Sequence, residues 1–480
     1  MSLRRKYESA SSVRQVYLGP EVHVFGDRVY IFGSHDKVGG ESFCLLDYEF
    51  FSSPINGDMK FTSRGINYSA KDDPGYGEDA RYLYAPDVVR GNDGRYYLYY
   101  SLSGWKGKGG YSHPISVAVS DEPDGKYKFL GYVRNKDGSV YDEYVCFDPA
   151  VINDEGRIRI YFGSGPFRNM RCEGWKKYIL SHVYSRVFNK PSSSFLTHPG
   201  PLGANVGELE DDMLTLSSKP KRILSENYGM HSFFEGASIR KVRDKYFFVY
   251  SSSLNHELCY AISDYPDRDF KFMGTIISNG DVGYEGRKEK DRVNATGTIH
   301  GSIEKIGDDW YVFYHRLTGG SDYSRQVCAE RIEINEDYHI TQVPLTSLGM
   351  DSKCLGKGKY STAISCGLKR GHMPHIANRI VKGIPCIKGI SDTMYISSMK
   401  KGTVATYKFF DLSDAHSFII KGKGKGIVAL IVNKIEASKA IFDSPSWDER
   451  SIDITLRDEK CVIEIEIVDG EVDLLEFRIE

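Results

Sequence analysis

The chain has 480 residues, more than one ordinary hydrophobic core organises, so we expect two domains, with three as the alternative. Its 63 Lys and Arg face 65 Asp and Glu, a net charge of −2, which excludes the electrostatic footprint of a nucleic-acid or anionic-membrane binder. Aromatic residues make up 13% of the chain and 48 glycines accompany them, a mixture typical of β-strands joined by tight turns.

The cysteines and the N-terminus bear on the compartment. Nine cysteines form no CxxC pair, so we expect neither a zinc site nor a full disulfide framework, but reduced thiols in the cytoplasm. The first residues are basic without the apolar run of a signal peptide, and no stretch is long and apolar enough to cross a membrane. The alternative is a secreted or periplasmic protein whose signal peptide is not part of this sequence.

One hairpin signature recurs five times along the chain: a turn, an aromatic-rich strand and, in most copies, a small residue. The copies read GDRVYIFGS, DGRYYLYYS, EGRIRIYFGS, RDKYFFVYS and GDDWYVFYH. Their spacing suits one four-stranded sheet per copy, which predicts an all-β, five-bladed propeller over residues 14–345. A β-sandwich with similar hairpins is the alternative, although its strands would be more closely spaced. Long segments before the second and fourth hairpins predict loops that wall a pocket.

An acidic residue precedes three of the hairpins in an otherwise apolar or small-residue context: Asp87, Asp148 and Glu235. The innermost strand of each blade runs beside the propeller axis, so acids at its start would meet around one mouth. Buried charges are costly unless they are paired or used, which favours a catalytic site. An acid that caps its own turn is the structural alternative for each of them.

The segments APDVV, FDPAV, EGASI and HGSIEKIGDDWYVFYHR resemble the blade motifs of family 43 glycoside hydrolases, propellers that act on arabinose- and xylose-containing glycans. The resemblance implies an inverting mechanism, with a general base on blade one, a carboxylate that tunes the pKa of the acid on blade three, and the general acid on blade four. Asp148 matches the tuning carboxylate and Glu235 the acid. Inversion needs one protonated and one ionised carboxyl roughly 6.5–9.5 Å apart, and a neighbouring ionised Asp would keep the acid protonated.

The general base is the departure from the family pattern. Blade one of the family starts with Asp-Pro, whereas this chain has Gly19-Pro20. Strand side chains alternate, so Glu21 points to the same face as position 19 and is our first candidate for the base. Asp36 or Asp47 is the second possibility, and a crippled or purely binding site is the third.

The resemblance also implies roles for other residues. His300 matches a family histidine on the axis that holds a calcium or other ion through water, although a lone His cannot hold calcium itself; a buried, hydrogen-bonded His is the alternative. Arg325 matches an Arg that approaches the sugar, and the alternative is an ion pair. His35 and Asp36 end the first inner strand and are predicted, with Asp87, to bind substrate, although Ser-His-Asp is also good turn chemistry. The chemistry itself requires no cofactor.

After residue 345 the composition changes: a Gly/Ser/Lys-rich segment is followed by short runs in which apolar and polar residues alternate. These runs predict a separate β-sandwich over residues 346–480. This tail is similar to family 6 carbohydrate-binding modules. Trp447 is either an exposed sugar platform there or a core residue.

The sequence therefore predicts an exo-acting, inverting glycoside hydrolase that releases arabinofuranose or xylose from plant-type oligosaccharides. A β-galactofuranosidase or arabinan hydrolase on the same fold is one alternative, and a non-catalytic glycan-binding propeller is another. The expected partner is an oligosaccharide, with no nucleic acid and no membrane. The sequence does not predict the oligomeric state.

Overall fold

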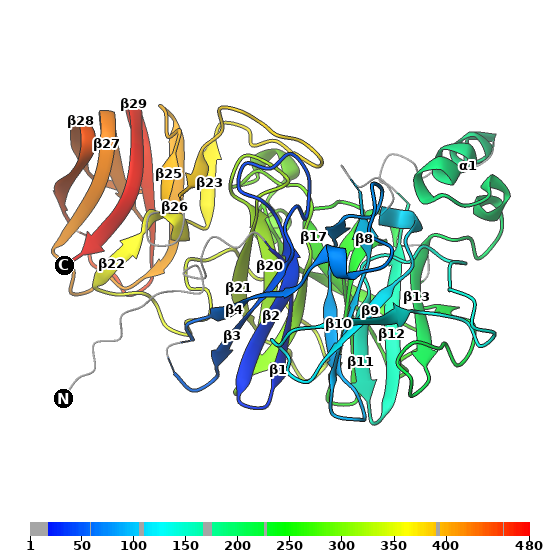
Figure 1. Cartoon of the computed structure of the whole chain (residues 1–480). Coiled ribbons are helices and arrows are strands. Elements are labelled where there is room, and N and C mark those ends of the chain that lie inside the picture. Colours follow the sequence, from blue (N-terminus) through cyan, green and yellow to red (C-terminus); the bar gives the residue numbers. More distant parts are fainter. Residues whose placement is uncertain are drawn as a thin grey trace.

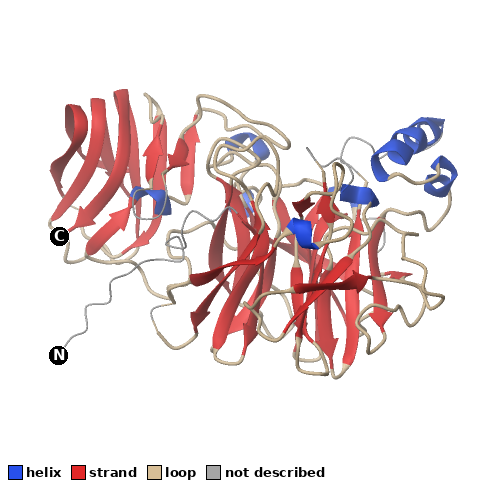
Figure 2. Cartoon of the chain, in the orientation of Figure 1, coloured by secondary structure: helices blue, strands red, loops and turns tan. Residues whose placement is uncertain are grey.

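A computed structural model describes residues 18–57, 59–104, 110–166, 175–224, 228–389, 394–454 and 456–480. Strands dominate it, and helices are few (Figure 2). The predicted start of the propeller at residue 14 lies outside the described residues, as does Cys172. No helix among the described residues is both long and apolar enough to cross a membrane.

Five antiparallel sheets form the blades of a propeller, which confirms the predicted all-β fold (Figure 1). Blade one contains β1 (Leu18–Phe25), β2 (Arg28–His35), β3 (Tyr48–Pro54) and β4 (Thr62–Tyr68). Blade two contains β6 (Asp87–Arg90), β7 (Tyr96–Tyr100), β9 (Ser116–Ser120) and β10 (Lys128–Tyr132). Blade three contains β11 (Ala150–Asp154), β12 (Arg157–Ser164), β13 (Gly203–Leu209) and β14 (Lys221–Arg222). Blade four contains β15 (Phe233–Val242), β16 (Lys245–Ser252), β17 (Glu257–Ser263) and β18 (Lys271–Ser278). Blade five contains β19 (Gly301–Ile306), β20 (Asp309–Leu317) and β21 (Arg325–Ile332).

The five recurring hairpins are the first two strands of each blade. Each turn needs a residue in the left-handed region, and Gly26, Gly94, Gly156 and Gly307 supply it at φ 64°, 86°, 89° and 63°. In blade four Arg243 takes this conformation at φ 56°. The first strands lie side by side around the axis, with β1 beside β19 and β15 between β11 and β19. The residues that enter these strands therefore meet at one end of the axis.

The elements outside the blades are short, apart from one helix. A two-stranded ribbon joins β5 (Tyr82–Leu83) to β8 (Leu102–Ser103). Helix α1 (Trp175–Phe188) stands out from the propeller between β12 and β13 (Figure 1). The 3₁₀ turns are Ala70–Asp72, Gly110–Ser112, Ser192–Leu196, Gly229–His231, Tyr284–Gly286, Glu289–Asp291 and Thr362–Ile364.

One prediction about loops was wrong. The long segment before the fourth hairpin was predicted to be a pocket wall, but it contains β13 and β14, the two outer strands of blade three. β13 reads GANVGEL and β14 is Lys221–Arg222, so both lack the aromatic residues of the inner strands. Pairing with β12 holds β13 in the sheet despite this weak local preference.

The tail is a β-domain whose eight strands surround one apolar core. Its strands are β22 (Gly358–Ser361), β23 (Gly367–Arg370), β24 (Cys386–Lys388), β25 (Tyr395–Ser397), β26 (Thr403–Phe410), β27 (Ser417–Val432), β28 (Ile435–Asp453) and β29 (Cys461–Ile479). The long strand β29 pairs with β22, β25, β26 and β27 and so ties the domain together. The last propeller strand ends at Ile332 and the first tail strand begins at Gly358.

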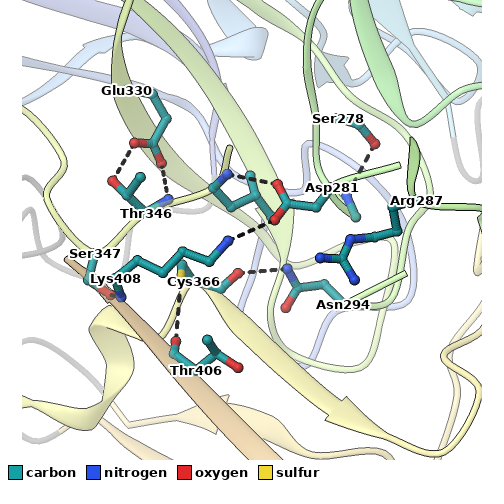
Figure 3. Close-up of polar contacts among 12 residues, drawn as sticks. Ser278, Asp281, Arg287, Asn294, Glu330, Thr346, Ser347, Cys366, Thr406 and Lys408 are labelled. Carbon is teal, nitrogen blue, oxygen red and sulfur yellow. Dashed lines mark hydrogen bonds and ion pairs between the residues drawn. The ribbon is translucent and has the colours of Figure 1, made fainter. Parts of the chain in front are cut away.

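Polar groups join the tail to blades four and five (Figure 3). The Lys408 ammonium lies 3.1 Å from the Asp281 carboxylate. The Asn294 side chain donates to the Cys366 carbonyl and accepts from the Leu368 N–H, at 2.9 and 2.8 Å. The tail is thus docked through buried, specific contacts.

Candidate active site

Asp148 and Glu235 lie at the axial mouth, at the entries of neighbouring blades. Asp148 precedes β11 in the left-handed conformation, φ 43°, and is buried. Glu235 lies in β15 beside a β-bulge, where the pairing with β16 shifts register on both sides of it. Gly236 takes φ 69° in this bulge, and its N–H donates to Asp148 Oδ2 at 3.0 Å. The bulge therefore couples the two predicted catalytic carboxyls through one backbone amide.

The surroundings separate the proton affinities of this pair. Burial raises the pKa of Asp148 to about 7, while the Gly236 N–H and Arg325 act to lower it. Burial, Asp148 and Asp322 raise the pKa of Glu235 well above its ordinary value. Asp148 accepts the amide hydrogen bond and ionises first, so Glu235 keeps its proton. This order matches the tuning carboxylate and the general acid.

Arg325, at the start of β21, is held by residues at the end of β2 and in the loop that follows it. Its Nε and Nη2 donate to the two oxygens of Asp36 at 2.8 and 2.7 Å. Nη2 also reaches Ser34 Oγ and Cys44 Sγ. Both carboxylate oxygens of Asp36 therefore bind Arg325 and position its guanidinium at the mouth.

Gly19 is buried at the same mouth. A Cβ atom placed on Gly19 would lie 3.2 Å from Arg325 Nη1, 3.6 Å from His300 Cβ and 3.7 Å from His315 Nδ1. The side chain of an Asp at this position would thus start beside the guanidinium of Arg325 and the side chains of His300 and His315. The structure places position 19, where the family pattern has its base, beside Arg325 and His300.

Glu21 lies two residues deeper along the axis, in different surroundings. Its Oε1 accepts from Arg240 Nη2 at 2.7 Å and from Ser238 Oγ at 3.0 Å. Burial raises the pKa of Glu21 to about 7, although Arg240 lowers it. None of its contacts with described residues reaches Asp148 or Glu235. Its assignment as the general base stays a prediction.

Asp87 belongs to the deeper cluster with Glu21. Its carboxylate lies 2.6 Å from His23 Nε2 and accepts the Val88 and Val151 N–H groups, both at 2.7 Å. These bonds link blades one, two and three at the axis. The predicted contact of Asp87 with substrate stays untested.

Two further candidates have their polar atoms engaged within blade one. His35 is buried and its Nε2 lies 2.7 Å from the Glu49 carbonyl oxygen, and burial lowers its pKa to about 4. Asp47 accepts the Ala70 N–H at 3.0 Å, so it caps a turn. Whether either residue acts in substrate binding or catalysis remains a prediction.

Sequence reasoning missed His315 and Asp322. His315 is the last residue of the fifth hairpin copy, where the other four copies end in Ser; that departure was the available signal. Asp322 is fully buried, accepts the Thr298 and Asn378 N–H groups at 3.0 and 2.6 Å, and raises the pKa of Glu235. The sequence around Asp322 contains no motif that predicts this role, and one of its partners, Asn378, lies far away in the tail.

Trp447 lies on the surface of the tail, partly exposed, and packs edge-on against Tyr395 at 5.4 Å. The Lys423 ammonium lies 4.6 Å from the centre of its ring. Trp447 is therefore outside the tail core, and its use as a sugar platform stays a prediction.

A five-bladed propeller with two neighbouring carboxyls at its axial mouth, of which Glu235 has the higher pKa and Asp148 the lower, has the equipment of a glycoside hydrolase. A sequence model of glycosyl hydrolases family 43 matches residues 59–340. The chain is 38% identical over 426 residues to a xylosidase/arabinosidase of Thermoclostridium stercorarium, an alignment that covers 84% of this chain and 82% of that one. The chain therefore belongs to family 43 of the glycosyl hydrolases. The match to the family model begins after β3, so Gly19 lies outside it.

Solved structures agree with this assignment. A β-xylosidase/α-arabinofuranosidase from a compost microbial metagenome, in complex with xylotriose, superposes with a TM-score of 0.51 at 26% identity, over 70% of this chain and 97% of that one. An arabinoxylan arabinofuranohydrolase from Bacillus subtilis shares the fold over 97% of this chain and 95% of its own, with a TM-score of 0.50 at 17% identity. The fold likeness thus includes the tail.

The first of these structures is described as a calcium-free form, which raises the question of calcium at His300. Burial and Arg325 lower the pKa of His300 to about 3, so its imidazole is neutral. His300 is in neither cluster of ligand-type side chains found among the described residues. Calcium needs six to eight oxygen ligands, and a neighbouring guanidinium repels a cation. The described residues around His300 therefore do not fit a calcium ion.

Proposed function

We propose that this family 43 enzyme releases terminal arabinofuranose or xylose from plant-type oligosaccharides with inversion of the anomeric carbon. The observation that supports it most is the Asp148–Gly236–Glu235 arrangement, which keeps one carboxyl protonated beside an ionised one. The names of the similar proteins, xylosidase/arabinosidase and β-xylosidase/α-arabinofuranosidase, support the choice of pentoses.

In this proposal Glu235 donates its proton to the leaving oxygen as the glycosidic bond breaks. Asp148 keeps that proton on Glu235 until it is needed, because a second negative charge beside an ionised Asp148 would be unfavourable. Arg325, fixed by Asp36, donates hydrogen bonds to the sugar bound at the mouth. In the same step a nucleophile attacks the opposite face of the sugar.

An arabinan hydrolase or β-galactofuranosidase on the same scaffold is the second candidate, since sugar identity depends on loop geometry. Aryl glycosides of α-L-arabinofuranose, β-D-xylose and β-D-galactofuranose separate these candidates. We expect turnover of the first two, with the inverted anomer appearing first by ¹H NMR. Release of galactofuranose alone, or of the retained anomer, would contradict the proposal.

We also propose a cytoplasmic location. The eight cysteines that the structure describes are all free thiols, and four of them lie in the propeller. Persistent free thiols are typical of a reducing compartment. Cell fractionation tests this, and recovery of the protein from the medium or periplasm would contradict it.

A further inference from the structure

The place vacated at position 19 still has two polar groups facing it. Arg325 uses Nε, Nη2 and its backbone N–H on Asp36, Ser34 and Cys44, and none of its hydrogen bonds to described residues comes from Nη1. That Nη1 is the atom 3.2 Å from a Cβ placed on Gly19. A charged donor therefore points at the space where a carboxylate is missing.

His315 supplies an acceptor at the same place. Its Nε2 lies 3.0 Å from the Thr298 carbonyl oxygen, so Nε2 carries the hydrogen and Nδ1 is a bare acceptor. His315 is fully buried, and Nδ1 has no hydrogen-bond partner among the described residues. A buried polar atom without a partner costs free energy, which a bound molecule would recover.

The two groups call for a molecule that is an anion and also has an acidic O–H. An anion restores the negative charge that an Asp would supply beside Arg325, and the O–H satisfies Nδ1 of His315. Inorganic phosphate has both features at neutral pH. A carboxylate has no O–H to donate, and water brings no charge.

We propose that inorganic phosphate binds beside Gly19, between Arg325 and His315, as the nucleophile, so that the enzyme catalyses inverting phosphorolysis of its glycosides. This inference rests on the proposed function, because it uses the same sugar site and the same acid. Phosphate oxygen forms the new bond to the anomeric carbon while the bond to the leaving oxygen breaks. Glu235 gives its proton to the leaving oxygen and regains one from solvent, to which the phosphate ester loses one of its two P–O–H protons. Glycoside and H₂PO₄⁻ thus yield a pentose 1-phosphate and the free alcohol, with no oxidant or further reactant.

Phosphate titration of the full chain with the aryl α-L-arabinofuranoside and β-D-xyloside tests the proposal. We expect turnover to rise saturably, at least tenfold above that in phosphate-free buffer, with the inverted pentose 1-phosphate visible by ³¹P NMR. Sulfate, which at neutral pH has no O–H for Nδ1 of His315, should not support turnover.

Gly19→Asp and the isosteric Gly19→Asn make a matched pair. The backbone at Gly19 is outside the left-handed region that requires glycine, and Arg325 Nη1, 3.2 Å from the new Cβ, must move by a few tenths of an ångström in both variants. Gly19→Asp should release free pentose at a rate independent of phosphate, because the new carboxylate activates water. Gly19→Asn should fill the phosphate place without providing a base, and so lose activity of both kinds.

The remaining outcomes each overturn the proposal in a distinguishable way. Free pentose from the wild type at a rate independent of phosphate would mean that one of the chain's own residues is the base. If the wild type is inactive with phosphate and Gly19→Asp is active, phosphorolysis is excluded, while the sugar site and the role of Glu235 as the acid are supported. If the wild type and Gly19→Asp are both inactive on all three aryl glycosides, the proposed function is contradicted and this inference with it.

Discussion

Gly19 and Glu21 lie on the same face of β1, two residues apart, yet they face different surroundings. Gly19 adjoins Arg325 and His315 at the mouth, whereas Glu21 contacts Arg240 and Ser238 deeper along the axis. The alternation of strand side chains correctly places both residues toward the axis. It does not predict the partner of the Glu21 carboxylate, because Arg240 comes from another blade.

Replacing Glu21 with Gln tests which role this residue has. Arg240 is buried and would lose one of its two carboxylate partners, while Glu304 remains. We therefore expect Glu21→Gln to cost about 2 kcal/mol of stability and to leave turnover of the aryl glycosides within about threefold. Urea unfolding and initial rates measure the two effects. A loss of turnover of 10²-fold or more at unchanged stability would make Glu21 the base.

The pH dependence of turnover tests the coupling of Asp148 to Glu235. The alkaline limb reports loss of the proton from Glu235, whose pKa is raised by burial and by the negative charge of Asp148. Asp148→Asn removes that charge and keeps an oxygen for the Gly236 N–H. The pKa of Glu235 should fall, so the alkaline limb should move about one pH unit lower. An unchanged alkaline limb would exclude the coupling.

At the scale of the element, the five hairpins could be predicted because turn chemistry and strand composition agree in each of them. The outer strands β13 and β14 could not, since only pairing with their neighbours makes them strands. The bulge in β15 also depends on pairing with β16, although the Gly after Glu235 was a visible hint.

The bulge predicts a specific effect of Gly236→Ala. Gly236 has φ 69°, a conformation in which a residue with a Cβ is strained, and relief of that strain would move the bulge and Glu235 with it. We expect a stability loss of about 1–2 kcal/mol and a fall in kcat of at least tenfold. Gly26→Ala is the matched control: its φ is 64° with nothing within 4 Å, so it should have a similar stability cost and unchanged kcat. Equal kcat in both variants would show that the bulge does not position the acid.

At the scale of the whole molecule, the sequence indicates two domains but not how they meet. The contacts between Lys408 and Asp281 and between Asn294 and Cys366 join segments far apart in the chain, and no local pattern announces them. Met373 and Ile376 of the tail also pack against Ala295 and Leu317 of the propeller. The domain boundary at residue 345 stays a prediction.

Truncation after residue 345 tests the role of the tail. It would expose the apolar contact, leave Asp281 without Lys408 and remove the Asn378 N–H from Asp322, which lies near Glu235. We expect the shortened chain to aggregate or to melt several degrees lower. Lys408→Met in the full chain is the control that removes only the ion pair. A monomeric propeller with unchanged stability and turnover would show that docking is dispensable.

The central claim is that Glu235 is the proton donor of a family 43 glycosidase, and the leaving-group dependence of Glu235→Gln tests it most directly. The measurement compares wild type and variant on a pentose oligosaccharide and on an aryl glycoside with a very acidic phenol, under the conditions that support wild-type turnover. We predict a loss of about 10²- to 10⁴-fold on the oligosaccharide and near-wild-type turnover of the aryl glycoside, which needs little proton donation. An equal loss on both substrates would contradict the account.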